Sequence, residues 1–599
     1  MRYLALASDY DGTLAHNGVV DDATIRAVER LLHSGRSFIL VTGRELPDLQ
    51  SVFPRLDLCE RVVAENGALL YNPATREKRT LGQRPPQSFL DNLRERGVQG
   101  TGAGEAIVAT WRPYATQVME AIQDSGLELQ MVFNKEAVMV LPPGVNKMTG
   151  LSAALKDLKL SAHNVAGIGD AENDHAFLDS CECSVAVANA IPALKERASF
   201  ITRGERGAGA VELIEKLIDN DLCDLAAQPR GESILIGQAG GQPVTMGCYG
   251  RNVLVCGQSG SGKSTLVTGL LERILDLRYQ VCLIDPEGDY ENLPGCRTVG
   301  DEKHAPSLKQ LKEALEDPDE QVIVNLVALS PSERPDCFAS LIAGIQELRI
   351  RTGRPHWLAI DEAHHVLPSN WAPSSPELAH QLSSLLLITV HPGHVSPAAL
   401  GKVNTAIVVG REPKALLDEF ASTIQVPGPE TPQHDLDRGE ALVWLRDENR
   451  LIARVKVEPC RNEPQRHRRK YAEGELEPDR SFYFRGPTGE MNLRAQNLNT
   501  FVQLAEGVDQ NTWVFHLKRG DYSRWLRWSV KDAELADRIA GIEQDESLAD
   551  GEPAAGERND TGQVHRSCVR CNRIVMRRAH GWLSIENLFL GWVFDSAVN

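Results

Sequence analysis

The sequence alternates short apolar runs with amphipathic segments, and this alternation limits the fold more than any other feature. Within residues 1–222, apolar runs such as 3–8 and 164–169 alternate with helical patterns such as 22–33. A second block of the same kind covers residues 233–457. Strands that alternate with helices form α/β sheets. The pattern therefore predicts two α/β domains in series.

The composition of the 599-residue chain is that of a globular protein. Hydrophobic residues make up 42% and charged residues 24%, which excludes wholesale disorder and fibrous repeats. The 64 basic and 82 acidic residues give a net charge of −18. This charge excludes a surface that binds nucleic acid everywhere, because Lys and Arg hold the phosphates. A local basic patch is still compatible with it.

The first residues and the cysteines predict a cytoplasmic protein. The opening MRYLALASDYDGT has no basic segment followed by a cleavage site. No apolar run approaches the ~18 residues that cross a bilayer. Most of the 12 cysteines stand singly in apolar runs, as Cys256 and Cys282 do, which is typical of reduced core thiols.

Shifts in composition set the predicted domain boundaries. The predicted parts are a first α/β domain at 1–222, a linker at 223–232, a second α/β domain at 233–457, a basic linker at 458–470, a small aromatic-rich domain at 471–545, and an acidic disordered stretch with a tail at 546–599.

The aromatic-rich domain interleaves aromatic with basic side chains and allows two interpretations. The rings could stack on bases, with Arg and Lys on phosphates. Alternatively, they form a small core that the basic side chains cover, and we favour this interpretation. In the tail, Cys568 and Cys571 lie near His565, but zinc needs four ligands, so a zinc site is not expected.

Two aspartates directly after the first apolar run point to phosphate chemistry. Asp9 and Asp11 lie in DYDGT, at the carboxyl end of a predicted strand, where α/β sheets bind ligands. A carboxylate can attack phosphorus when a divalent cation neutralises the site, and a second carboxyl can protonate the leaving oxygen. The alternative is an Asp-Gly turn with solvated carboxylates.

Other strand ends supply matching groups. Thr42 ends the run FILVT and can hydrogen-bond a phosphate oxygen. Lys147 can supply a compensating positive charge, and Asp170 and Asp174 of GDAEND can hold a metal directly or through a neighbour.

These motifs, in this order, resemble those of the haloacid dehalogenase superfamily of phosphatases. The resemblance implies a Rossmann-like domain in which Asp9 is the nucleophile and Asp11 the general acid/base. It implies that Thr42 and Lys147 bind phosphate and that Asp9, Asp11, Asp170 and Asp174 form the Mg²⁺ site.

An insert at 72–143 falls between the second and third of these motifs. Its position resembles the cap of the Cof-type and sucrose-phosphatase-like subgroup, which AENGA at 64–68 also fits. Such caps imply a small phosphorylated metabolite as substrate.

A glycine-rich loop in the second α/β domain is typical of nucleotide binding. GQSGSGKST follows the strand NVLVC and precedes a helical pattern, as a phosphate-binding loop requires. Its backbone N–H groups can face the phosphates, Lys263 can reach the β/γ-phosphates, and Ser264 can bind Mg²⁺. The predicted ATP-binding residues are Gly257, Gln258, Ser259, Gly260, Ser261, Gly262, Lys263, Ser264 and Thr265.

A second motif, HWLAIDEAHH, complements this loop. Asp361 can hold the Mg²⁺ shell and Glu362 can polarise the attacking water, which favours a hydrolase over a kinase. The alternative is an acidic pair that caps a helix. With LIDPEGDY at 283–290, the domain resembles the HerA/FtsK class of ring-forming ATPases. The resemblance assigns a γ-phosphate sensor to His391, and Arg411 is a candidate arginine finger.

We therefore expect a bifunctional enzyme: a Mg²⁺-dependent phosphatase fused to an ATP-hydrolysing, homo-oligomeric ring ATPase. One alternative is a protein of a repair or defence system that processes nucleic-acid ends or translocates nucleic acid. Another is an ATP-driven switch in which one half acts as a sensor. No membrane partner is expected.

Overall fold

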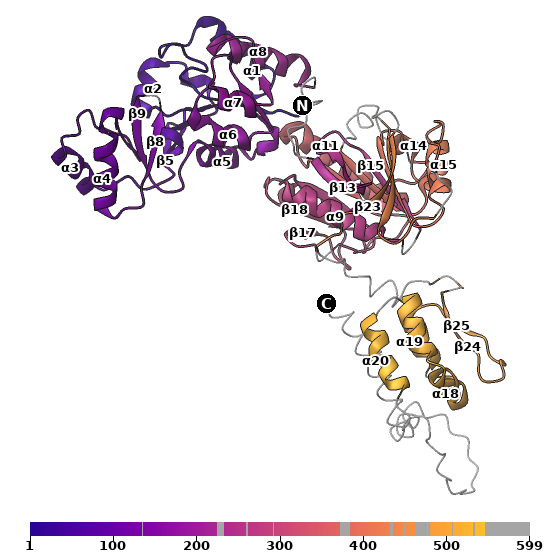
Figure 1. The fold of residues 1–599 in the computed structure, drawn as a ribbon. Helices are drawn as coiled ribbons and strands as arrows, with labels where there is room; N and C mark the ends of the chain where they lie inside the picture. The colour runs from indigo at the N-terminus through magenta and orange to yellow at the C-terminus, as the bar shows by residue number, and fades with distance from the viewer. Residues whose placement is uncertain are drawn as a thin grey trace. The chain divides into compact units, whose positions relative to one another are not determined.

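The computed structural model describes residues 1–134, 136–223, 233–258, 261–290, 293–371, 384–431, 435–446, 451–461, 476, 478, 480–505, 507–530 and 533–544. The chain divides into two compact units, 1–464 and 465–599, each described here by itself (Figure 1). The predicted α/β class is confirmed. None of the described helices has the length and apolar character needed to span a membrane.

The first domain is built on an eight-stranded sheet in the order β12-β11-β10-β1-β2-β3-β4-β5. Its strands run parallel except at β4 and β5. They are β1 (Ala5–Ser8), β2 (Ser37–Val41), β3 (Arg61–Ala64), β4 (Leu69–Asn72), β5 (Glu77–Thr80), β10 (Val165–Gly169), β11 (Cys183–Ala186) and β12 (Phe200–Ile201). The accompanying helices are α1 (Asp22–His33), α2 (Leu46–Val52), α5 (Lys147–Leu158), α6 (His175–Ser180), α7 (Pro192–Arg197) and α8 (Arg206–Asn220).

A smaller antiparallel sheet with two helices forms a lobe beside this domain (Figure 1). Its strand order is β6-β7-β9-β8, and Phe89, Leu93 and Val118 lie in its own buried core. Its elements are α3 (Gln87–Glu95), β6 (Gly102–Ala103), β7 (Val108–Trp111), α4 (Ala115–Ser125), β8 (Gln130–Asn134) and β9 (Ala137–Leu141). Within the predicted cap range of 72–143, β5 pairs with β4 in the main sheet, so the lobe itself begins at α3.

The second domain contains an eleven-stranded sheet in the order β14-β13-β23-β22-β21-β15-β20-β19-β16-β18-β17. Its strands are β13 (Ser233–Ala239), β14 (Gln242–Gly247), β15 (Val253–Gly257), β16 (Val281–Asp285), β17 (Cys296–Val299), β18 (Gln321–Asn325), β19 (Trp357–Ile360), β20 (Leu385–Thr389), β21 (Thr405–Val409), β22 (Glu440–Leu445) and β23 (Leu451–Val457). Its helices are α9 (Lys263–Asp276), α10 (Leu308–Leu315), α11 (Arg334–Thr352), α12 (Ala363–Val366), α14 (Pro397–Leu400) and α15 (Pro413–Thr423).

Burial on both faces explains why the central strands of this sheet are continuous apolar runs. Successive residues of β15 belong to two different cores: Leu254 to one, Val255 to the other. Because side chains alternate along a strand, the two cores lie on opposite faces of the sheet.

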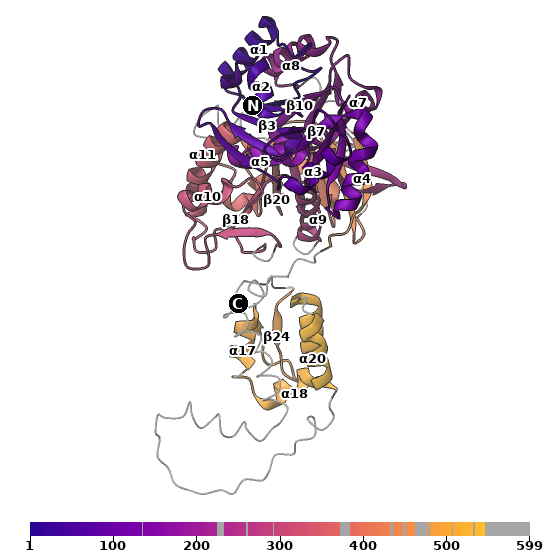
Figure 2. The ribbon, with the colours of Figure 1, turned by 90° about the vertical axis from the view of Figure 1, so that its left-hand side faces the viewer.

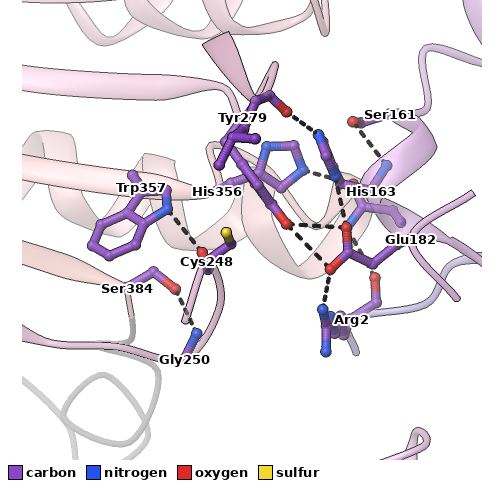
Figure 3. A network of polar contacts seen from close by, with 12 residues as sticks. Arg2, Ser161, His163, Glu182, Cys248, Gly250, Tyr279, His356, Trp357 and Ser384 are labelled. Carbon is purple, nitrogen blue, oxygen red and sulfur yellow. Dashed lines mark hydrogen bonds and ion pairs between the residues drawn. The ribbon is translucent and has the colours of Figure 1, made fainter. Parts of the chain in front are cut away.

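A polar seam joins the first two domains, and Glu182 is its centre (Figure 3). The Glu182 carboxylate pairs with the Arg2 guanidinium and accepts a hydrogen bond from the Tyr279 hydroxyl at 3.0 Å. The His163 ring stacks on Tyr279 with 3.8 Å between ring centroids. Its Nδ1 lies 2.7 Å from Glu182, and its Nε2 lies 2.8 Å from the Leu277 carbonyl oxygen. Both ring nitrogens of His163 therefore face a hydrogen-bond acceptor, one from each domain.

His356 and Arg354 extend the seam. His356 Nδ1 accepts the Gln280 N–H at 2.9 Å, and its Nε2 lies 3.2 Å from Asn164 Oδ1. Burial and the neighbouring charge of His163 lower the pKa of His356 well below its ordinary value, which fits a neutral ring. Arg354 Nη2 donates to the Lys159 carbonyl oxygen at 2.7 Å.

Most of these residues lie just before the amino ends of strands, whereas the Leu277 and Lys159 carbonyl oxygens lie at the carboxyl ends of helices. Asn164 and Glu182 directly precede β10 and β11 of the first domain, and His356 directly precedes β19 of the second. The carboxyl ends of the parallel strands, where ligands bind in such sheets, therefore face away from the seam in both domains.

The unit at 465–599 contains a small aromatic core. A β-hairpin lies among helices in its described part (Figure 2). The elements are β24 (Phe482–Phe484), β25 (Leu493–Ala495), α17 (Leu498–Ala505), α18 (Gln510–Lys518), α19 (Asp521–Trp525), a π-helical turn (Leu526–Val530) and α20 (Ala533–Glu543). The buried rings are Phe482, Phe484, Phe501, Trp513, Tyr522 and Trp525. This burial agrees with the core interpretation, although Trp528 is exposed. The tail with His565, Cys568 and Cys571 lies outside the described residues.

Replacing Glu182 with Gln should destabilise the seam by about 3 kcal/mol, because it leaves the Arg2 guanidinium without its partly buried counter-charge. Burial alone would raise the pKa of Glu182, but the His163 hydrogen bond and the Arg2 charge outweigh it and hold this pKa below its ordinary value. The stabilisation is therefore present at neutral pH and is lost as the pH falls through the lowered pKa. The urea unfolding midpoint of the full chain measures both effects.

The matched control is Glu316→Gln, which removes the exposed Glu316–Lys159 ion pair between the same two domains. Its midpoint should stay close to that of the parent protein. Equal midpoints for the two variants would contradict the central role of Glu182.

Candidate active sites

Three neighbouring parallel strands bring the predicted residues of the first domain together. Asp9 follows β1, Thr42 follows β2 and Asp170 follows β10, and these strands lie in the order β10-β1-β2. Lys147 begins α5, where Asn146 caps the helix. The side chains of Asp9, Thr42, Lys147, Asp170 and Asp174 are buried at the carboxyl edge of the sheet.

A buried ammonium group links two of the carboxylates. Lys147 Nζ donates to Asp9 Oδ1 at 2.5 Å and to Asp174 Oδ1 at 2.6 Å. The other Asp174 oxygen accepts the backbone N–H groups of Asp170 and Ala171, both at 2.9 Å. Asp174 therefore orients both the lysine and the loop that carries Asp170.

The same carboxylates could hold a divalent cation. One oxygen from each of Asp9, Asp170 and Asp174 lies within 4.8 Å of the others. Burial and the charge of Asp174 raise the pKa of Asp9, whereas Lys147 lowers it. One lysine does not balance three buried carboxylates, and hard oxygen donors suit Mg²⁺, so the donor set fits this ion.

Asp11 lies apart from this cluster, in an ion pair that the sequence motifs do not reveal. Arg44 Nε and Nη2 lie 2.6 and 2.7 Å from the two Asp11 oxygens, and Arg44 Nη1 lies 2.6 Å from Asp48. Hydrogen bonding to Asp11 raises the pKa of Arg44 despite its partial burial. Proton donation by Asp11 would require this pair to open.

Glu65 connects the site to the neighbouring lobe. Its carboxylate accepts the backbone N–H groups of Glu105, Ala106 and Ile107 at 2.9, 2.9 and 3.2 Å. Glu65 has φ 53°, a left-handed conformation that its other contacts must maintain. The motif AENGA was the available signal, but it does not specify the partner of the glutamate.

Gly67 in the same turn permits a close approach to α5. A Cβ atom at this position would lie 1.9 Å from the carbonyl oxygen of Asn146, directly before Lys147. Its φ of +102° also favours glycine.

In the second domain, the glycine-rich loop connects β15 to α9. Gly262 has φ 101° and Lys263 is the first residue of α9, followed by Ser264 and Thr265. Lys263 Nζ donates to the carbonyl oxygens of Gly257 and Gln258 at 2.8 and 3.1 Å. The loop also includes Ser261, whereas Ser259 and Gly260 lie outside the described residues.

Asp361 and Glu362 follow β19, which β20 separates from β15. Asp361 is buried, and Glu362 has φ 38°. Oxygens of Asp361, Asp285 and Asp289 lie within 4.8 Å of one another. Sequence reasoning did not assign Asp285 and Asp289, although both lie in the quoted LIDPEGDY.

His364 Nδ1 lies 3.1 Å from the Thr389 hydroxyl at the end of β20. His391, the predicted sensor, instead contacts Thr389 through its backbone N–H at 3.2 Å, and its ring lies 5.1 Å from that of His394. Arg411 is exposed just beyond β21.

Comparisons with known proteins match different families to the two domains. The haloacid dehalogenase-like hydrolase family matches residues 6–110 and 113–214, and the central domain of helicase HerA matches 244–342. A phosphoglycolate phosphatase of Aeropyrum pernix is 30% identical over 224 residues, which are 35% of this chain and 92% of that protein. Phosphoglycolate phosphatase 2 of Saccharolobus solfataricus is 29% identical over 230 residues, which are 36% of this chain and 94% of that protein. A solved haloacid dehalogenase-like hydrolase of Bacteroides thetaiotaomicron is 16% identical in sequence. The match covers 36% of this chain and 99% of that one, with a TM-score of 0.32.

The Glu65 contact predicts a measurable change in the lobe. In Glu65→Gln one acceptor oxygen becomes an NH₂ group, so at least one of the N–H bonds from residues 105–107 is lost whichever way the amide lies. Losing a charge-assisted bond of about 1.5 kcal/mol should speed amide exchange at 105–107 roughly tenfold. Hydrogen-exchange mass spectrometry measures this, with Glu77→Gln on exposed β5 as the control. Unchanged exchange at 105–107 would show that Glu65 does not anchor the loop.

Proposed function

Because the chain belongs to the haloacid dehalogenase-like hydrolases through its first domain, we propose that this domain is a Mg²⁺-dependent phosphomonoesterase. The observation that carries the proposal is the buried Lys147 ammonium between Asp9 and Asp174. It holds one Asp9 oxygen in place at a strand end, beside an acidic cluster that fits Mg²⁺.

In the proposed reaction, Asp9 attacks the phosphorus atom and forms an aspartyl-phosphate while the ester P–O bond breaks. Asp11 gives its proton to the leaving oxygen and later takes one from the water that hydrolyses the intermediate. Thr42 and Lys147 bind phosphate oxygens. When bound, Mg²⁺ supplies the positive charge that lets a carboxylate approach a phosphate. Asp170 would hold the ion together with the Asp9 carboxylate and the backbone carbonyl of Asp11, and Asp174 would support the site.

Small phosphorylated metabolites are the proposed substrates. The lobe at 87–141 is held beside the site by Glu65, as expected of a cap. Since the relatives are named phosphoglycolate phosphatases, phosphorylated carboxylic acids are the first compounds to test.

For the second domain, at 233–457, we propose ATP hydrolysis in a homo-oligomeric ring in the cytoplasm. The loop at 257–265 would bind ATP, Ser264 and Asp361 would hold Mg²⁺, and Glu362 would activate water. The HerA match and the position of β20 between β15 and β19 support this. His391 and Arg411 stay candidates for the sensor and the arginine finger. Nucleic acid is the candidate cargo, because the matching family includes a helicase.

Asp9→Asn should abolish phosphate release from phosphoglycolate and from an aryl phosphate, because the amide is a poor nucleophile and lacks the charge that binds the cation. ATP hydrolysis should continue, since the seam lies at the opposite edge of both sheets. Asp22→Asn at the exposed start of α1 is the control. Persisting phosphate release would assign the nucleophile to another residue.

Glu362→Gln should bind ATP but lower its hydrolysis by about 10²-fold or more, as expected for loss of a general base. Filter binding and phosphate release measure the two steps, with and without DNA. Normal turnover would place water activation elsewhere, and rates insensitive to every DNA and RNA form would argue against a nucleic-acid cargo.

A further inference from the structure

Three aspartates lie together at the carboxyl ends of two adjacent strands in the second domain. Asp285 is the last residue of β16, and Asp361 directly follows β19, its parallel neighbour. One oxygen from each of Asp285, Asp289 and Asp361 lies within 4.8 Å of the others. Asp285 and Asp361 are buried and Asp289 is partly buried.

The loop after β16 is folded so that it completes this cluster. Asp285 Oδ1 accepts the N–H groups of Glu287 and Gly288 at 3.2 and 2.8 Å, and Oδ2 accepts that of Tyr290 at 2.9 Å. These bonds turn the loop back over the strand end and bring Asp289 to Asp361. The two N–H bonds occupy both lone pairs of Oδ1, whereas Oδ2 accepts the Tyr290 N–H and has a second lone pair that can bind a cation.

The charge of the cluster favours a cation. Asp285, Asp289 and Asp361 bring three carboxylates within 4.8 Å of one another, and Glu362 directly follows Asp361 in the chain. The positive charge of Arg334 interacts with the negative charge of Asp285. The Arg334 guanidinium also contacts a second group, because its Nη1 lies 3.4 Å from His365 Nδ1. Like charges at this separation in a largely buried site repel strongly, and a divalent ion would remove the repulsion.

Tyr290 provides an independent indication of a ligand. Its side chain is only 4% exposed, and its hydroxyl has no hydrogen-bond partner among the described residues. The charges of Asp361, Asp289 and Asp285 all act on this hydroxyl. A buried hydroxyl without a partner is costly, and a water molecule on a bound cation would satisfy it.

We propose that Asp285, Asp289 and Asp361 form a divalent-cation site that is occupied before nucleotide binds, with the Tyr290 hydroxyl bonded to a water on the ion. Ser264 and Asp361 are the Mg²⁺ ligands proposed above for the ATPase. The present site adds Asp285, at the end of β16, and Asp289, in the loop that follows. Its part in catalysis rests on the proposed ATPase function, but cation binding does not.

Titration of the full chain with Mn²⁺, followed by electron paramagnetic resonance without nucleotide, tests the proposal. All proteins carry Asp9→Asn and Asp170→Asn, which remove ligands from the first-domain site. This background should bind Mn²⁺, and adding Asp289→Asn should weaken the Kd at least tenfold. Asp285→Asn should do the same, but it also disturbs the loop, so Asp289→Asn is the decisive variant. Tyr290→Phe should weaken binding by a smaller factor.

Two controls separate this site from the nucleotide site and from surface acids. Lys263→Ala should lose ATP binding and keep Mn²⁺ binding, and Asp301→Asn, in an exposed loop of the same domain, should keep both. Mn²⁺ binding that is unaffected by Asp289→Asn, or that requires ATP, would overturn the proposal. If the protein binds Mn²⁺ at these aspartates but does not hydrolyse ATP, the cation site stands and the proposed ATPase function is refuted.

Discussion

The Glu182 carboxylate holds the two α/β domains together, and the arrangement of both candidate sites depends on where it does so. It pairs with Arg2 and meets His163 and Tyr279 at the amino ends of strands from both sheets. Parallel sheets bind ligands at their carboxyl ends. The seam therefore uses the edge of each sheet that catalysis does not need, and each site can work without sharing a pocket with the other.

Both sites collect buried carboxylates at strand ends and must compensate their charge. In the first domain Lys147 lies between Asp9 and Asp174 and supplies part of the compensation. In the second domain Asp285 and Asp361 lie on adjacent strands, with Asp289 on the loop between elements. In both, the grouped carboxylates offer hard oxygen donors that could hold a divalent cation.

Much of the fold followed from the sequence because its signals are local. Apolar runs predicted the buried strands, and the confirmed haloacid dehalogenase and HerA resemblances came from motifs of a few residues. The structure places Asp9 after β1, Lys147 against Asp9 and Asp174, and Lys263 at the start of α9. The roles of these three residues are proposals that mutation can test. The Arg44–Asp11 pair was not predictable, because an arginine in a loop has many acidic residues within reach.

The sequence by itself determined two α/β domains and placed their polar motifs at strand ends. Both features depend on residues that are adjacent in the chain, namely an apolar strand and the loop that follows it. Only the tertiary structure decided which distant groups meet. Glu65 bonds to a loop about forty residues away, and Glu182 meets Tyr279 across nearly one hundred. Such contacts depend on strand order and on how domains pack, which no local pattern encodes.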